Sequence, residues 1–172
     1  MSPRAASALL ALATALALSP PAAEARKSDR NQPMDIDAGR HEGVFDDSAP
    51  TVLSRGVTIT QGTLDIRADR ADIHSRGGDI TRAVLTGAPA VMRQEMDDGA
   101  PMTARARRID YDMRTEVVTL TGDAFVEQPR GSMKSQRIVY NMQTGRVESG
   151  GDDAGRVQMR FEPRNAAPQD GD

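Results

Sequence analysis

The sequence lacks cysteine and tryptophan, and its 172 residues include only two tyrosines and three phenylalanines. Without cysteine the chain forms no disulfide bonds, so its fold depends on packing and hydrogen bonding. With so few aromatic side chains, the core has to be thin and built from valine, isoleucine, leucine, methionine and alanine. Scattered aromatics also argue against a hydrolase or carbohydrate-binding β-domain, in which clustered rings stack on sugars.

A strong excess of charge of either sign is also missing. The 22 Lys and Arg residues and 25 Asp and Glu residues give a net charge of −3. A nucleic-acid-binding domain normally carries a strongly basic face, so nucleic acid is not an expected partner. The length suits one domain or one array of repeats.

The residue types needed for catalysis are sparse. The two histidines, His41 and His74, have no nucleophile signature nearby. His74 precedes an "RGGD" turn, which favours a solvated turn histidine over a metal ligand. Paired carboxylates at 97–98 and 152–153 lack the ligand spacing of a calcium loop, and the glycine-rich "ESGGDDAG" lacks the ending of a phosphate-binding loop. We therefore predict no catalytic residue, no cofactor and no metal site.

The N-terminus has the pattern of an export signal. One arginine precedes an apolar run over 5–18, and an A-x-A sequence ends at Ala25. This pattern predicts a cleavable signal peptide over 1–25, with cleavage between Ala25 and Arg26, and a periplasmic mature protein. An uncleaved anchor is the alternative, although the run is short for a membrane span. Residues 26–33 are polar and read as a flexible lead.

From Met34 onward, apolar and polar residues alternate with the period of two that is typical of half-buried strands. Short joints such as "QG", "RGGD", "MRTE" and "QTGR" separate the runs and favour hairpins between antiparallel neighbours. No helical stripe is sustained after residue 25. The sequence thus predicts an all-β antiparallel meander. The alternating runs lie at 34–38, 57–59, 64–68, 109–113, 138–142 and 157–161.

A repeat underlies this alternation. A small residue, any residue, an arginine and a branched or aromatic residue three positions after the arginine recur around Arg70, Arg108 and Arg137, with a degraded copy at Arg40. Each copy is followed by "LTG" or a relative of it, and a polar insertion at 94–101 lengthens the middle spacing. A sequence unit that recurs in this way along the chain indicates stacked copies of one structural unit. The arginines fit an outward charged row or a set of phosphate clamps, and the outward row is the simpler interpretation.

Five segments together resemble a known family. "MDIDA", "GVTITQGTLDIRADRADI", "LTGAPAVMRQ", "ARRIDYDMRTEVVTLTGDAFVEQ" and "SQRIVYNMQTGRVESGG" are similar to the OstA-like, or LptA, family of lipopolysaccharide-transport proteins, over about residues 31–163. The resemblance implies an open, twisted antiparallel β-jelly roll at 34–163, followed by a polar tail at 164–172. It also implies a periplasmic carrier that relays lipopolysaccharide from the inner to the outer membrane without catalysis.

The inward side chains of such a sheet would form an apolar groove for the lipid A portion of lipopolysaccharide. Flexible methionine and aliphatic side chains suit acyl chains. A dry core is the alternative, and with it a structural adaptor that polymerises without binding lipid. The residues that we predict to line the groove are Ile36, Val57, Ile59, Leu64, Ile66, Ile73, Leu85, Ile109, Val118, Leu120, Phe125 and Val139.

The two ends of the chain's sheet are the predicted partner edges. Met34 and Ile36 lie in the first strand, and Val157, Met159 and Phe161 lie in the last. Open strand edges recruit partners by strand addition. The resemblance implies an inner-membrane OstA-like anchor protein at one edge, an outer-membrane translocon or a like subunit at the other, and head-to-tail self-association. The alternative is that the edges fold back or are masked by the tail.

Overall fold

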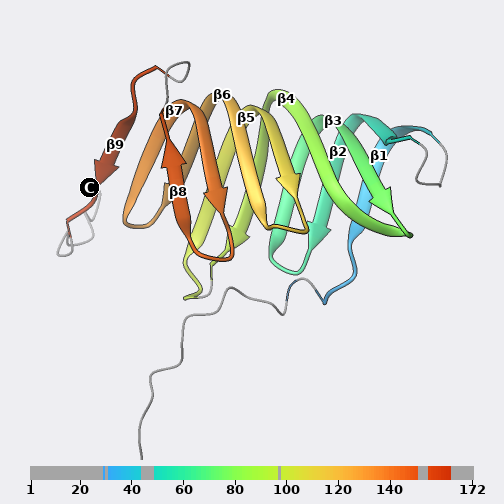
Figure 1. The fold of residues 1–172 in the computed structure, drawn as a ribbon, viewed down its shortest axis with the longest axis horizontal. Coiled ribbons are helices and arrows are strands. Elements are labelled where there is room, and N and C mark those ends of the chain that lie inside the picture. The colour runs from blue at the N-terminus through green and yellow to red at the C-terminus, as the bar shows by residue number, and fades with distance from the viewer. Residues whose placement is uncertain (1–28, 30, 44–48, 97, 151–154, 164–172) are drawn as a thin grey trace, which may run out of the picture.

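The computed structural model describes residues 29, 31–43, 49–96, 98–150 and 155–163, and it shows one antiparallel sheet (Figure 1). Among these residues, no helix has the length and apolar character needed to cross a membrane. The nine strands of the sheet are β1 (Asp35–Glu42), β2 (Thr51–Gln61), β3 (Leu64–Arg76), β4 (Asp79–Glu95), β5 (Pro101–Asp112), β6 (Val117–Gln128), β7 (Gly131–Asn141), β8 (Arg146–Ser149) and β9 (Gln158–Phe161).

Consecutive strands are neighbours from β1 to β8, as short hairpin joints require. At the "MRTE" joint, the Asp112 carboxylate accepts hydrogen bonds from the backbone N–H groups of Arg114 and Thr115, at 2.9 and 3.1 Å. At the far end, β7 has two partners: β8 pairs with its second half, and β9 pairs with its first half. The predicted open antiparallel sheet is confirmed, with β1 at one edge and β8 and β9 at the other.

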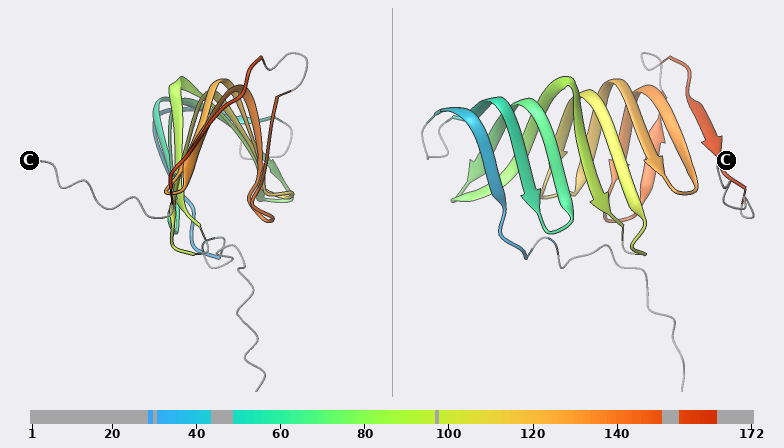
Figure 2. Two further views of the ribbon diagram at one scale, coloured as in Figure 1. Left: turned by 90° about the vertical axis from the view of Figure 1, so that its left-hand side faces the viewer. Right: turned by 180° about the vertical axis from the view of Figure 1, so that it is seen from behind.

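The repeat produces a corner in the sheet. In β3, the outward residues Asp69 and Arg70 lie side by side between buried Ala68 and Ala71, and the strand register shifts at this point. β5 repeats this arrangement at Arg107 and Arg108. Two consecutive outward residues form a β-bulge, which bends a strand. Aligned bulges therefore fold the sheet into two legs that meet at a corner (Figure 2).

The "LTG" element forms the same corner on the intervening strands β4 and β6. In β6, Gly122 has φ of 80° and lies between buried Leu120 and Ala124. Glycine reaches this backbone region at low cost. β4 has one residue more than β2 and β6 at this corner, because residues 86–89 separate its buried side chains and only residues 54–56 and 121–123 do so in the other two.

The repeat arginines lie in one row along the outside of the corner. Strand register places Arg70 opposite Ser54 and Thr86, and places Arg108 opposite Thr86 and Thr121. Arg70 pairs with Asp72 at 2.7 Å, and Arg108 lies 3.6 Å from Asp110. The row thus alternates arginine with serine or threonine and faces away from the buried side chains. The full row is Arg40, Ser54, Arg70, Thr86, Arg108, Thr121 and Arg137.

Part of the predicted flexible lead is anchored to the sheet. The Asp29 carboxylate is 7% exposed and accepts a hydrogen bond from the backbone N–H of Thr63 at 3.1 Å. Gln61 donates its side-chain N–H to the Gln32 carbonyl, also at 3.1 Å. These contacts hold the lead on the β2–β3 turn, which its polar composition did not indicate. The signal peptide at 1–25, the cleavage site at Ala25 and the tail at 164–172 lie outside the described residues.

Candidate functional site

The inner faces of the two legs pack against each other and form the interior of the molecule. One leg, leg A, ends in the β2–β3, β4–β5 and β6–β7 turns, and the other, leg B, ends in the β3–β4, β5–β6 and β7–β8 turns. Nine of the twelve predicted groove residues lie in this single buried cluster, each with 7% or less of its surface exposed. They are Val57, Ile59, Leu64, Ile66, Ile73, Leu85, Ile109, Val118 and Leu120.

Three predicted groove residues lie elsewhere. Ile36 pairs with buried Ile59, but it sits on edge strand β1 and is 38% exposed. The placement of Phe125 and Val139 on the inner face is wrong, because both are flanked in sequence by buried residues and strand alternation turns them outward. On the outer face, the Arg105 guanidinium stacks on the Phe125 ring, 4.2 Å from its centre.

The sequence-based list also omitted side chains that the structure buries. Ile138 and Tyr140 flank Val139 and are 0% and 2% exposed, and Val126 follows Phe125 with 6% exposed. Their signal was present in the sequence, because Ile138, Tyr140 and Met142 continue one alternating phase. Apolar residues in consecutive positions cannot share one face of a strand. The alternation of the strand as a whole therefore decides which of the two points inward.

The interior differs in composition along its length. Around β2 and β3 it is lined by aliphatic side chains such as Ile59, Leu64 and Ile66. Toward β7 it gains Tyr111 and Tyr140 and most of the methionines. Methionine is unbranched and adapts its shape more readily than isoleucine or valine. The methionines packed in or against the interior are Met34, Met92, Met96, Met102, Met113, Met133 and Met142.

Two pockets reach the methionine-rich part of the interior. The end groove has a volume of about 470 Å³ and is lined by Val126, Met133, Val147, Met159 and Phe161, among others, beneath β9. The seam pocket has a volume of about 310 Å³ and lies where the free rims of the two legs face each other. Apolar chains therefore have two places at which to approach the interior.

A family model described as "LptA/(LptD N-terminal domain) LPS transport protein" matches residues 36–146 of this sheet. The chain belongs to this family. Lipopolysaccharide export system protein LptA of Escherichia coli K12 is 29% identical over 156 residues, which cover 90% of this chain and 84% of that protein. LptA of Haemophilus influenzae is also 29% identical, over 87% of each chain.

A solved relative shares the fold. The crystal structure of LptH, the LptA-homologous periplasmic component of the lipopolysaccharide transport device of Pseudomonas aeruginosa, superposes with a TM-score of 0.71 and 25% identity. The match covers 79% of this chain and 99% of LptH. The family resemblance of the sequence is thus confirmed by the family model, by curated LptA relatives and by a solved structure.

The two predicted edges lie at opposite ends of this LptA-family sheet. Ile36 is exposed on β1, and Met34 packs against the interior just before that strand. At the other end, Met159 and Phe161 on β9 are 55% and 77% exposed, and Val157 is exposed just before it. Among the described strands, β1 and β9 each pair on one side, so each edge combines an open strand side with exposed apolar side chains.

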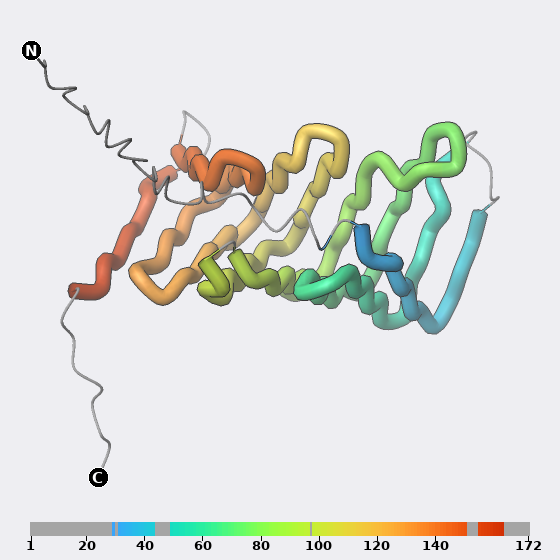
Figure 3. Tube along the Cα trace, turned by 90° about the horizontal axis from the view of Figure 1, so that it is seen from below, coloured from blue at the N-terminus to red at the C-terminus, as the bar shows by residue number. Residues whose placement is uncertain are grey.

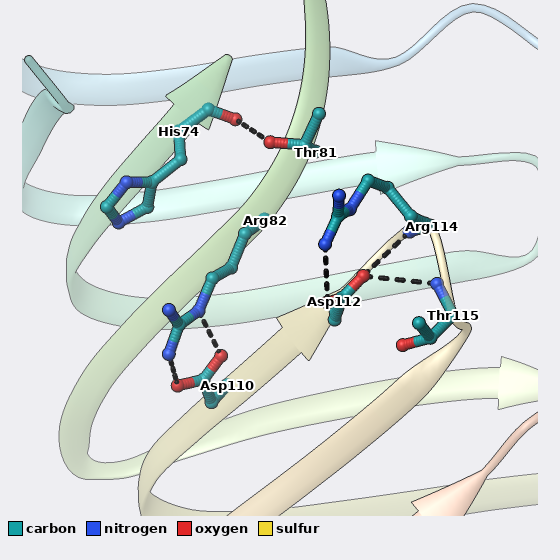
Figure 4. Close-up of polar contacts among 7 residues, drawn as sticks. All are labelled: His74, Thr81, Arg82, Asp110, Asp112, Arg114 and Thr115. Carbon is teal, nitrogen blue, oxygen red and sulfur yellow. Dashed lines mark hydrogen bonds and ion pairs between the residues drawn. The ribbon is translucent and has the colours of Figure 1, made fainter. Parts of the chain in front are cut away.

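The outer face carries ion pairs (Figure 4). Arg82 donates from Nε to Asp110 at 2.7 Å, and Asp110 also lies near Arg108. The hydrogen bond from Arg82 holds the pKa of Asp110 below its usual range, against the opposing effect of partial burial. His74 lies near the end of β3, where its carbonyl accepts a hydrogen bond from the Thr81 hydroxyl at 3.2 Å.

This pair predicts a pH dependence. Because the folded-state pKa of Asp110 is lowered, its ion pair stabilises the fold above the unfolded pKa of about 4, and this contribution is lost as pH falls through the folded value. We expect the melting temperature of Asp110→Asn to fall less steeply below about pH 4 than that of the wild type. Thermal melts across this range are the measurement, with exposed Asp79→Asn as the control. Parallel curves for wild type and Asp110→Asn would contradict the prediction.

The described residues hold no group of three or more histidine, cysteine, aspartate or glutamate side chains that is arranged to bind a metal ion. Asp97 and residues 152–153, which belong to the carboxylate pairs considered from the sequence, lie outside the described residues. The chemistry that the described side chains offer is therefore apolar burial inside and salt-bridged strand surface outside.

Proposed function

We propose that the protein is a periplasmic carrier that binds lipopolysaccharide through its interior and relays it from the inner to the outer membrane without catalysis. The observation that carries this proposal is membership of the LptA family over the sheet whose two legs enclose the apolar cluster. Relatives are named as lipopolysaccharide export proteins, and LptH is described as a periplasmic component.

The energetics of burial support this function. Each acyl methylene transferred from water to an apolar interior contributes about 0.8 kcal/mol. The several acyl chains of the lipid A portion can therefore pay for separating two legs that are held together mainly by apolar contact. No reacting group is needed for this exchange of one apolar partner for another.

Partners of the carrier are assigned to its edges. The exposed apolar side chains of β1 and β9 suit addition of strands from other β-sheets. We propose an inner-membrane OstA-like anchor at one edge, and a like subunit or the outer-membrane translocon at the other. Residues 1–25 would direct the chain to the periplasm and be removed between Ala25 and Arg26.

A second candidate function rests on a specific observation. Leu85, Ile109 and Leu120 are fully buried within the apolar cluster, so side chains of the protein itself fill this part of the interior. A structural adaptor that polymerises through its edges and binds no lipid would need nothing more than this core.

Photo-crosslinking in cells separates the two functions. Met133 faces the interior and the end groove, whereas its neighbour Lys134 is exposed on the outer face. A photo-reactive residue at position 133 is expected to capture lipopolysaccharide, and the same residue at 134 is expected to capture little. Met133 tolerates the exchange better than a fully buried position because it is only partly buried. Absence of lipid from both positions in an assembled protein would favour the adaptor.

A further inference from the structure

The interior has to open before it can accept lipid. Met92 on leg A and Ile138 on leg B are both 0% exposed, and Tyr140 is 2% exposed. Protein interiors are close-packed, so acyl chains cannot thread between side chains that already touch. The legs are continuous at the corner, because strands β2 to β7 run from one leg into the other. Separation must therefore take place at their free rims, along the seam that Figure 3 shows from below.

A hydrogen bond between described residues crosses this seam. The Tyr140 hydroxyl, on leg B, donates to the Met96 sulfur, just beyond the end of β4 on leg A, at 3.4 Å. The two residues are 44 positions apart in the sequence. A thioether is a weak acceptor, and methionine has three rotatable bonds. This contact therefore closes the seam but is easily broken when the seam opens.

Met96 lies in the β4–β5 turn. This turn belongs to the polar insertion at 94–101, which has no role in the repeat. Its described residues bond mainly to one another: Met96 N–H donates to the Ala100 carbonyl at 2.8 Å, and Gly99 N–H donates to the Met96 carbonyl at 2.9 Å. Ala100 N–H donates to the Asp98 carboxylate at 2.9 Å. A turn that satisfies its own backbone can move away from leg B without leaving those groups unpaired.

The seam pocket lies directly at this contact and has walls of different chemistry. Met96, Ala100 and Pro129 line it from leg A, and Met142 and the β7–β8 turn line it from leg B. Met96 and Met142 offer adaptable apolar surface on opposite rims. Arg130 lines the pocket with a positive charge, and Asp98, which also lines it, engages its carboxylate with the Ala100 N–H. This combination fits an amphiphile with apolar chains and an anionic head.

We propose that the seam pocket is a lateral portal through which the acyl chains of an anionic lipid reach the interior, and that the contact between Met96 and Tyr140 holds this portal closed. The proposal rests on the proposed lipid-carrier function and adds a route to it. Entry through the seam requires only that the rims part between the β4–β5 and β7–β8 turns, whereas entry at the sheet ends leaves this contact intact.

Crosslinking the seam tests the portal, and the absence of native cysteine makes the labelling specific. Ala100→Cys with Gln143→Cys places one thiol on each rim of the seam pocket. Bridging them with a short bismaleimide is expected to slow uptake of fluorescent lipopolysaccharide from micelles about tenfold, the factor produced by a barrier about 1.4 kcal/mol higher. Thr103→Cys with Glu127→Cys is the matched control, because these outward residues pair across β5 and β6 on leg A, do not line the seam pocket, and their crosslink leaves the seam free.

Equal uptake rates for the two crosslinked proteins would overturn the portal while leaving the carrier function intact. Failure of both proteins and of the uncrosslinked wild type to bind lipopolysaccharide would instead refute the carrier function itself. The experiment therefore distinguishes the route from the activity.

Single substitutions test the closing contact. Tyr140→Phe and Met96→Leu keep the apolar volume but remove the donor or the sulfur. Each is expected to speed lipopolysaccharide uptake roughly two- to five-fold, the change that corresponds to a hydrogen bond worth about 0.5–1 kcal/mol. Met113→Leu is the control, since Met113 also packs against the interior but lies in the β5–β6 turn and does not line the seam pocket. Identical acceleration in Met113→Leu, or none in either test variant, would overturn the role of the contact.

Discussion

Replacing Ile138 by threonine is expected to lower the free energy of unfolding by about 3 kcal/mol, whereas the same replacement at Val139 is expected to cost less than about 1 kcal/mol. Ile138 is 0% exposed and pairs with buried Leu120 across the β6–β7 ladder. Threonine there removes apolar volume and buries a hydroxyl. Val139 is half-buried on the outer face, between Thr119 and Glu148, where a hydroxyl remains accessible to water.

Urea unfolding of the two variants beside the wild type measures this difference. Threonine is β-branched like the residues it replaces, so strand propensity is nearly constant across the comparison. An unchanged dependence on urea concentration would show that both variants unfold as the wild type does. Equal destabilisation at 138 and 139, or the larger loss at 139, would contradict the assigned faces of β7.

The period-two pattern was sufficient to predict most of this fold. Alternation gave the strands, and short joints made consecutive strands antiparallel neighbours, because a few residues can connect only adjacent antiparallel ends. Leu64 and Ile66 were placed correctly on the inner face because polar residues separate them. Val139 was misplaced because its neighbours are apolar too, and apolar character alone does not identify the inward residue.

The repeat was visible in the sequence, but its structural role was not. The "LTG" elements and the arginines mark the corner, where strands place two or more consecutive residues outward. An alternating sequence pattern does not reveal such a bulge. The bulge changes which residues face inward, and it is recognised only from the shift in pairing with the neighbouring strand. With the register known, Arg70 and Arg108 fall in one outer row, which identifies the arginines as part of the corner.

The candidate site depended on contacts that no local pattern contains. Tyr140 and Met96 belong to different repeat units and meet only because the sheet folds at its corner and brings the rims together. The insertion at 94–101 read as an exposed loop, and its polar composition fits that description. What the sequence could not provide was the position of this loop over the seam, opposite the β7–β8 turn.

The C-terminal edge should control self-association. Replacing Met159 and Phe161 together by lysine is expected to weaken head-to-tail association about 100-fold, because exposed aromatic and apolar anchors contribute roughly 2 kcal/mol or more at such contacts and lysine guards strand edges. Both side chains are more than half exposed in the single chain, so its melting temperature should change little. Sedimentation velocity over a concentration series measures the association.

A matching change at the other end makes the test specific for head-to-tail pairing. Ile36→Lys places a charge on exposed β1 and leaves β9 unchanged. Each variant alone should remain largely monomeric, because a chain of subunits needs both edges. An equimolar mixture should form dimers and no longer species, since the intact β9 edge of one variant meets the intact β1 edge of the other and both outer ends are blocked.

The alternative geometry gives the opposite pattern. If two β9 edges paired with each other, Ile36→Lys alone would still dimerise, and mixing it with the Met159 and Phe161 double variant would reduce the dimer fraction. The mixture therefore decides between a contact that can propagate and one that closes on itself. Only a propagating contact would join the apolar interiors of successive subunits end to end, which is what a bridge between two membranes requires.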